Sequence, residues 1–254
     1  MTHDISGDGK KDVNDLEWHY LKGDGDFRSD EIIQLRNEAD IIITNPPFSL
    51  FREFLVWIVE ANKQFVIIGN MNAITYKDVF PLIKENKMWL GATGNGNDMV
   101  FAVPAGAEVA ESDRQKAARL GYVGDYTRLG NSCWFTTFDH GRRHQSLQLM
   151  TMADNLRFNK KMQGKTAYET YDNYDAIEVP FTNAIPSDHA EVMGVPISFL
   201  DKYSPEQFEI VGASDNGVVD EKYKLPHFKK HNEPYVNGNK QYKRIFIKHK
   251  KKQQ

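Results

Sequence analysis

The chain has 254 residues, of which 40% are hydrophobic and 26% charged, and its formal net charge is -3. This length and composition are typical of a globular protein with a substantial core, in one large domain or two smaller ones. No apolar stretch approaches the roughly 20 residues of a membrane span, and the residues after Met1 do not form a signal peptide. Cys133 is the only cysteine, which excludes an intrachain disulfide and favours a reducing, cytoplasmic compartment.

The first 40 residues are acidic, with 11 Asp or Glu against 5 Lys or Arg. Within them, oxygen-bearing side chains alternate as in the twelve-residue loop that wraps calcium, with Gly9 at position six and Asp in place of the usual final Glu. The ligands in this interpretation are Asp4, Ser6, Asp8, Asp12 and Asp15. The alternative is a solvated acidic turn, which the lysines inside the loop favour.

The pattern from Ser29 to Lys87 predicts an alternation of helices and strands. Ser29 followed by Asp30 and Glu31 is a helix cap, and a β-branched strand runs over residues 39–44. An amphipathic helix over residues 49–63, a buried strand over 64–70 and a second helix over 77–87 follow. Continuous apolar strands separated by helices indicate α/β architecture with a parallel sheet covered by helices on both faces.

The second half of the chain has a different texture. Strands are predicted at residues 98–104 and 132–138, pairing antiparallel, with a helix over 107–120 between them. Short strands at residues 192–196, 208–212 and 242–248 indicate a smaller mixed subdomain. We therefore expect one domain over residues 1–165 and a smaller carboxyl-terminal subdomain over residues 166–254.

The carboxyl-terminal segment is basic, since residues 222–254 contain 11 Lys or Arg against Glu233 alone. Aromatic residues are interleaved with the cations, a pattern that favours contact with nucleic-acid phosphates. The candidates are Lys229, Lys230, Lys243 and Arg244. A solvated basic surface is the competing interpretation.

Asn45-Pro46-Pro47-Phe48 ends the first predicted strand and is the strongest chemical signal in the chain. An exocyclic amine attacks a methyl sulfonium poorly while its lone pair is delocalised. Two acceptors aimed at its protons, the Asn45 side-chain oxygen and the Pro46 carbonyl, favour the tetrahedral nitrogen that attacks. The prolines hold these acceptors rigid, and Phe48 offers a face for an extruded base.

Two alternatives remain open for this tetrapeptide. Asn and Pro also form ordinary strand-ending turns for local reasons. The same acceptor geometry suits other amines, such as a base in rRNA or the side chain of a protein glutamine.

With these motifs, the chain from Leu21 to about Gly212 resembles the EcoRI-type adenine-specific DNA methyltransferases. The matching stretches include residues 23–29, 39–52, 67–76, 134–136, 139–143, 150–156 and 192–196. The resemblance implies a Rossmann-like fold, S-adenosylmethionine as cofactor, double-stranded DNA as substrate and a role in restriction-modification. It also implies that Asp26 and Phe27 hold the adenine ring of the cofactor, and it makes Arg142 and Arg143 candidates for DNA-phosphate contact or a solvated loop.

One departure from the family affects the cofactor site. A complete site of this type needs a first strand, a glycine turn, a helix and a second strand, together about 30 residues or more. Only 22 residues precede Gly23. We therefore expect a truncated chain that binds S-adenosylmethionine weakly or not at all unless a missing amino-terminal segment or a second chain completes it. A catalytically inactive nucleic-acid-binding fragment is the alternative function.

Overall fold

The computed structural model describes residues 5, 7–9, 20–92, 99–214 and 233–250. The chain divides into two compact units, Met1–Asp40 and Ile41–Gln254. No helix in these described ranges is both long and apolar enough to cross a membrane.

The first unit contains α1 (Asp30–Glu38), which begins as its sequence predicts. The hydroxyl oxygen of Ser29 accepts a hydrogen bond from the Ile32 amide, and Asp30 and Glu31 occupy the first turn, where carboxylates favour the helix dipole.

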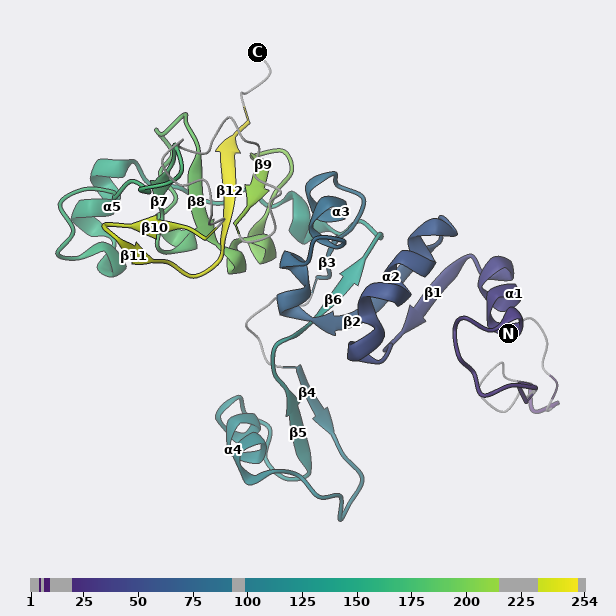
Figure 1. Cartoon of the computed structure of the whole chain (residues 1–254). Coiled ribbons are helices and arrows are strands. Elements are labelled where there is room, and N and C mark those ends of the chain that lie inside the picture. Colours follow the sequence, from purple (N-terminus) through teal and green to yellow (C-terminus); the bar gives the residue numbers. More distant parts are fainter. Residues whose placement is uncertain (1–4, 6, 10–19, 93–98, 215–232, 251–254) are drawn as a thin grey trace. The chain divides into compact units, whose positions relative to one another are not determined.

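The second unit holds the remaining elements, labelled in Figure 1. Its α-helices are α2 (Phe51–Glu60), α3 (Phe80–Lys84), α4 (Glu111–Arg119) and α5 (Met152–Phe158). Its 3₁₀ helices are η2 (Phe48–Leu50), η3 (Met71–Thr75), η4 (Gly141–His144), η5 (Lys160–Met162), η6 (Thr182–Ala184) and η7 (Ile197–Lys202). Its strands are β1 (Ile41–Thr44), β2 (Gln64–Asn70), β3 (Trp89–Leu90), β4 (Met99–Ala102), β5 (Tyr126–Leu129), β6 (Ser132–Thr136), β7 (Ile177–Glu178), β8 (Met193–Pro196), β9 (Phe208–Ala213), β10 (Tyr235–Val236), β11 (Asn239–Lys240) and β12 (Arg244–His249).

The first sheet has the strand order β1-β2-β6-β3. β1 and β2 are parallel, with Thr44 opposite Ile67, whereas β6 runs antiparallel to both β2 and β3. The predicted α/β class is confirmed, but the prediction of a parallel sheet is wrong beyond its first pair. β6 lies between β2 and β3 and is buried at four of its five positions, so it is an interior strand of this sheet.

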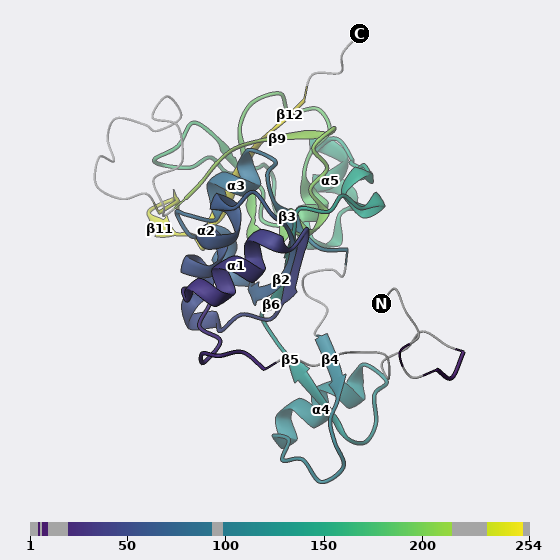
Figure 2. The same ribbon diagram turned by 90° about the vertical axis from the view of Figure 1, so that its right-hand side faces the viewer.

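Two other predictions from the sequence are corrected. β4 does not pair with β6 but with β5, in a two-stranded ribbon along which α4 packs (Figure 2). The helix predicted over residues 77–87 is shortened to α3, because residues 76–79 form a turn before it and Asn86 adopts a positive φ of 59° just after it.

The second sheet has the strand order β7-β8-β12-β9 and is also mixed, since only β7 and β8 are parallel. It confirms the strands predicted near residues 192, 208 and 242. Large rings of Tyr174, Phe199, Phe208 and Phe246 are fully buried against it. The predicted division between residues 165 and 166 stays a prediction. α5 and η5 lie before that point, but Asn159 between them donates a hydrogen bond to the carbonyl of Asn183, which lies after it.

Candidate active site at the carboxyl ends of β1 and β2

The predicted catalytic tetrapeptide lies directly after β1. Because β1 and β2 are parallel, the loops that follow them meet at the same edge of the sheet. One loop is Asn45–Phe48 and the other begins at η3. The sequence pattern thus places the candidate residues where parallel sheets usually hold their functional groups.

The backbone of the tetrapeptide is fixed while its acceptors stay available. Pro46 is buried, and the Pro47 carbonyl accepts a hydrogen bond of 2.9 Å from the Leu50 amide, which closes η2. Asn45 is exposed, and within the described residues neither its side chain nor the Pro46 carbonyl has a hydrogen-bond partner. Both acceptors proposed for an amine are therefore unused by the fold.

Phe48 and the helix behind it complete this edge. Phe48 is 40% exposed, so part of this residue is accessible to a ligand. Phe51, three residues on, is buried and packs on Phe135 of β6 with 5.1 Å between ring centroids. A Cβ at Gly69 would lie 2.4 Å from the Phe51 ring, so only glycine allows α2 to approach β2 this closely.

The loop after β2 contributes residues that the sequence interpretation missed. Arg52, in the first turn of α2, forms an ion pair with Asp78 and lies over the ring of Tyr76, 5.9 Å from its centroid. Tyr76 is 38% exposed. These contacts join the helix after one loop to the turn after the other. Twenty-six residues separate Arg52 from Asp78, so no local pattern marks the pair.

The predicted cofactor residues Asp26 and Phe27 belong to the first unit. Arg28 donates to both carboxylate oxygens of Asp26, at 2.9 and 2.7 Å, and these bonds lower the pKa of Asp26 to about 2. Phe27 is 9% exposed, and the Arg28 guanidinium lies 5.3 Å from its ring centroid. The acid is ionised at neutral pH, and its present partner is Arg28.

Arg142 and Arg143 of η4 make contacts within the protein. Arg142 donates to the Ala92 carbonyl at 2.9 Å and to the Asp201 carboxylate of η7 at 2.6 Å. The Arg143 guanidinium lies 3.8 Å from the Trp89 ring centroid and pairs with Asp139 at 3.2 Å. Their predicted DNA contact stays a prediction, and the structure gives both side chains a structural role.

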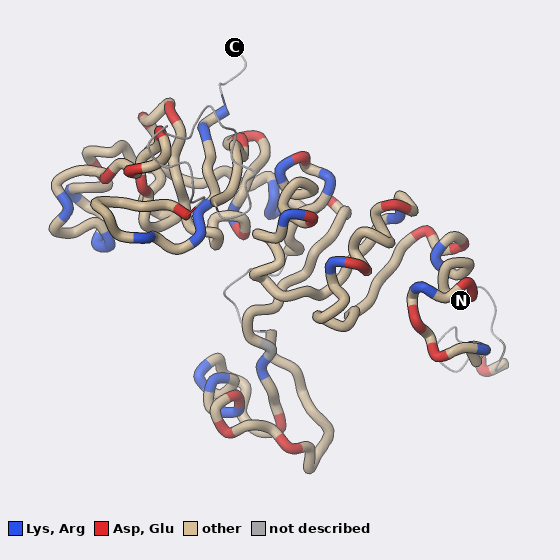
Figure 3. Tube along the Cα trace, viewed as in Figure 1, with Lys and Arg blue, Asp and Glu red and all other residues tan. Residues whose placement is uncertain are grey.

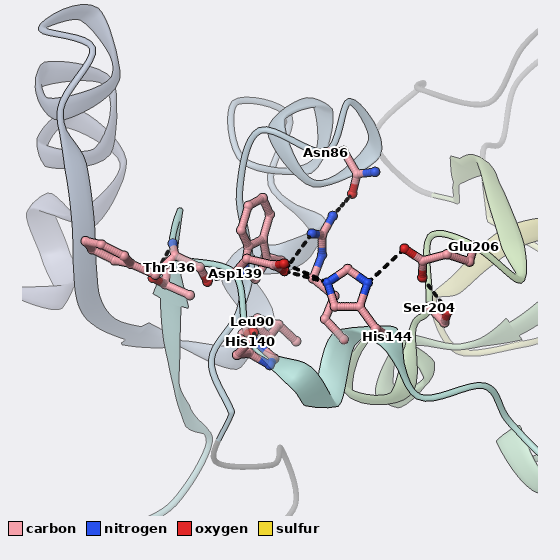
Figure 4. A network of polar contacts seen from close by, with 11 residues as sticks. Asn86, Leu90, Thr136, Asp139, His140, His144, Ser204 and Glu206 are labelled. Atoms are coloured by element: carbon pink, nitrogen blue, oxygen red, sulfur yellow. Dashed lines mark hydrogen bonds and ion pairs between the residues drawn. The ribbon is translucent and has the colours of Figure 1, made fainter.

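His144 forms a bridge beside these arginines, shown in Figure 4. Its Nε2 lies 2.7 Å from the Asp139 carboxylate and its Nδ1 lies 2.8 Å from that of Glu206. The hydrogen bond to Asp139, and then the one to Glu206, raises the pKa of His144. We call Asp139, Arg143, His144 and Glu206 the clasp, because it joins the end of the first sheet to the segment before β9.

The basic carboxyl-terminal residues have different environments. Lys229 and Lys230 lie outside the described residues. Lys243 reaches the candidate site, where its ammonium donates to the Thr75 hydroxyl at 3.2 Å. Arg244 is buried and bonds to Glu178 at 2.6 Å, so a phosphate could reach it only by breaking that ion pair. Figure 3 shows Lys and Arg interspersed with Asp and Glu along the backbone trace of this unit.

The predicted calcium loop lies largely outside the described residues. Asp8 is described and exposed, while Asp4, Ser6, Asp12 and Asp15 are not described. Among the described residues, no group of three or more His, Cys, Asp or Glu side chains is placed to hold a metal ion. Calcium binding is therefore unsupported.

The model of the family "Adenine-specific methyltransferase EcoRI" matches residues 1–250. By class the chain is an adenine-specific DNA methyltransferase of type II restriction-modification systems. The two unused acceptors after β1 suit methyl transfer to an amine. The chain belongs to the EcoRI adenine-specific methyltransferase family. The predicted family, function and enzyme class are confirmed.

Curated relatives agree with this assignment. The chain is 43% identical to the type II methyltransferase M.EcoRI of Escherichia coli, over 96% of this chain and 68% of that protein. It is 36% identical to M.MgeORF184P of Mycoplasma genitalium, over 93% of this chain and 73% of the relative. It is 31% identical to M.MpnI of Mycoplasma pneumoniae, over 97% and 74%. No solved structure matches the chain.

Proposed function

We propose that Asn45 and Pro46 hold the N6 amine of a DNA adenine for methyl transfer from S-adenosylmethionine. The cofactor supplies an electrophilic methyl group on a sulfonium. The Asn45 side-chain oxygen and the Pro46 carbonyl accept the two N6 protons, which makes the nitrogen more tetrahedral and frees its lone pair. The nitrogen-carbon bond forms as the sulfur-carbon bond breaks, and one N6 proton then leaves to solvent.

The observation that carries this proposal is the pair of unused acceptors on a rigid loop. Pro46 is buried and Pro47 is the N-cap of η2, so the backbone between Asn45 and Phe48 is held on both sides. Acceptors that are already oriented need no reorganisation as charge develops on the amine. The partly exposed ring of Phe48 gives an extruded adenine a surface on which to stack.

Asp26 and Phe27 have side chains that suit the adenine end of S-adenosylmethionine. A carboxylate accepts from an exocyclic amine, and a phenyl ring covers a ring face. Arg28, whose side chain is 57% exposed, holds Asp26 in an ion pair that costs little to break at the surface. Asp26 is therefore available to a ligand once Arg28 moves aside.

The free edge of β1 supports a partner in the completed enzyme. Within the described sheet, β1 has a neighbour on one side only, and Ile43 of this strand is 71% exposed. An open edge with an exposed apolar side chain is a template for another strand. A polypeptide segment, in a longer form or in a second chain, would extend this sheet toward a Rossmann-like arrangement and complete the cofactor site.

The test is methylation of duplex DNA, with N6-methyladenine measured by mass spectrometry. Asn45→Ala should lower turnover by about 10²–10³, the loss expected for one preorganised hydrogen-bonding group. Its thermal stability should match that of the parent because Asn45 is exposed. Ser49→Ala, an exposed change in η2, is the matched control and should keep full turnover.

Two results would count against the proposal. Unchanged turnover in Asn45→Ala would remove the acceptor role. A protein that binds both DNA and S-adenosylmethionine but forms no methyladenine would favour the second candidate function, a nucleic-acid-binding protein without catalysis. The free edge of β1 is the observation that favours this second function, because the cofactor site stays incomplete unless a further strand pairs there.

A further inference from the structure

A hollow of about 460 Å³ lies at the carboxyl ends of β7 and β8, and no residue of the candidate catalytic loop lines it. These two strands are parallel, with Glu178 opposite Gly194. Residues 180–183 follow β7 into one wall, and Pro196 and Ser198 follow β8 into another. The carboxyl ends of neighbouring parallel strands are a preferred place for ligands, and the volume lies within the usual range of binding pockets.

The lining of the hollow carries positive charge. Lys161 of η5 and Lys202 at the end of η7 both line it, and both are exposed. Its one carboxylate, Asp201, is already neutralised by Arg142, whose guanidinium lies 2.6 Å away. The net charge offered to a ligand is therefore that of the two ammonium groups.

Neutral donors and an aromatic ring complete the lining. Thr182, Asn183 and Ser198 bring two hydroxyls and an amide, groups that often bind phosphate oxygens in nucleic-acid complexes. The Lys161 ammonium lies 5.2 Å from the centroid of the Phe181 ring. This contact holds the cation at the wall of the hollow.

The residues just before Lys161 in the chain have the same chemistry. Phe158, at the end of α5, is 61% exposed, and the Arg157 guanidinium lies 5.0 Å from its ring centroid. Lys160 is exposed next to it in the chain. A free anion would need only the hollow. The additional cations and the exposed ring next to Lys161 in the chain suit a long polyanion that carries bases.

We propose that this hollow binds a backbone phosphate of the substrate DNA through Lys161 and Lys202. The inference rests on the proposed function, since DNA is the substrate named there, and it adds a second contact region outside the candidate active site. The site positions the duplex and reads no bases, because its donors fit phosphate oxygens.

The test uses the full chain and a fluorescent duplex titrated from about 50 to 200 mM salt. The double variant Lys161→Gln with Lys202→Gln should flatten the slope of log affinity against log salt by about 0.9, the contribution of one phosphate contact in duplex DNA. The control, Lys84→Gln with Lys116→Gln, removes the same charge from exposed positions on α3 and α4 and should keep the parent slope. Thermal melting of both variants checks that they fold.

The outcomes separate this site from the proposed function. In the methylation assay, the double variant should raise the DNA KM and leave kcat unchanged, whereas Asn45→Ala lowers kcat and keeps the salt slope. A double variant with the parent slope, or a control with the same loss, would overturn the site. Inorganic phosphate that binds to the parent but not to the double variant, without competing with duplex, would show a free-anion site instead. A parent that binds no duplex would overturn both proposals.

Discussion

The ammonium of Lys243 donates a hydrogen bond to the hydroxyl of Thr75, across 168 residues of sequence. Thr75 ends η3, which follows β2 at the candidate active site, and Lys243 immediately precedes β12 of the second sheet. The contact therefore joins the two sheets beside the loop that we assign to methyl transfer. Arg142 with Asp201, and the clasp, join them at other points.

We predict that Lys243→Met and Thr75→Val are coupled in stability. Thr75 is 4% exposed, so its bond to a cation is shielded from water and each change removes the same interaction. A double-mutant cycle by urea unfolding should give a coupling free energy of about 0.5–1.5 kcal/mol. Strictly additive effects would show that the bond contributes nothing to the fold.

Gly69→Ala should destabilise the protein by about 1–3 kcal/mol, the range for overpacking a filled core. The added methyl would meet the Phe51 ring, and relief of the clash would move the start of α2 with the candidate catalytic loop. We expect methyl transfer to fall as well. Gly141→Ala is the control, because nothing lies within 4 Å of its new Cβ, and it should stay within about 0.5 kcal/mol of the parent in chemical denaturation.

Stability should depend on pH through the clasp. Asp139 and Glu206 face His144 and raise its pKa in the folded chain above the ordinary value of 6.5, while Arg143 shares Asp139. A raised histidine pKa contributes stability that is fully present below the ordinary pKa and is lost as pH rises through the folded pKa. Melting temperature should therefore fall from pH 6 upward, and His144→Gln should flatten that part of the profile. An identical profile in the variant would leave the clasp without a pH role.

Arg244→Met should destabilise the protein by about 3–5 kcal/mol, because it leaves the Glu178 carboxylate buried without its cation. Glu178 is 4% exposed and also accepts from Tyr171. Adding Glu178→Leu to the same variant should recover much of the loss in urea unfolding, since no charge then stays buried. If Arg244→Met instead folds like the parent and weakens DNA binding, Arg244 contacts phosphate after all.

The sequence predicted the features that depend on local pattern. Asn45–Phe48 was identifiable because two prolines after a β-branched run constrain the backbone whatever the rest of the chain does. Ser29 was identifiable as a helix cap because its signal is also local, a serine followed directly by Asp30 and Glu31. The candidate catalytic loop is thus marked by its own residues, independently of its surroundings.

Features that depend on distant partners were not predictable. β6 and β4 are both short apolar strands, and only the fold decides that one is central and the other belongs to a ribbon. Likewise the count of cations near Arg244 carries no information on burial, because its partner Glu178 lies 66 residues away. Lys161 and Lys202 lie far apart in the sequence, so no local pattern predicts that they line the same hollow.

The β4-α4-β5 lobe leaves and rejoins the first sheet at neighbouring points. β3 and β6 pair directly, and the Gly91 amide bonds to the Trp134 carbonyl at 2.9 Å. At the other end, the Asn131 carbonyl accepts from the Met71 amide at 2.7 Å. Both ends of the lobe are therefore fixed by the first sheet. Evolution could lengthen, shorten or exchange the lobe without altering the register on which Asn45 depends.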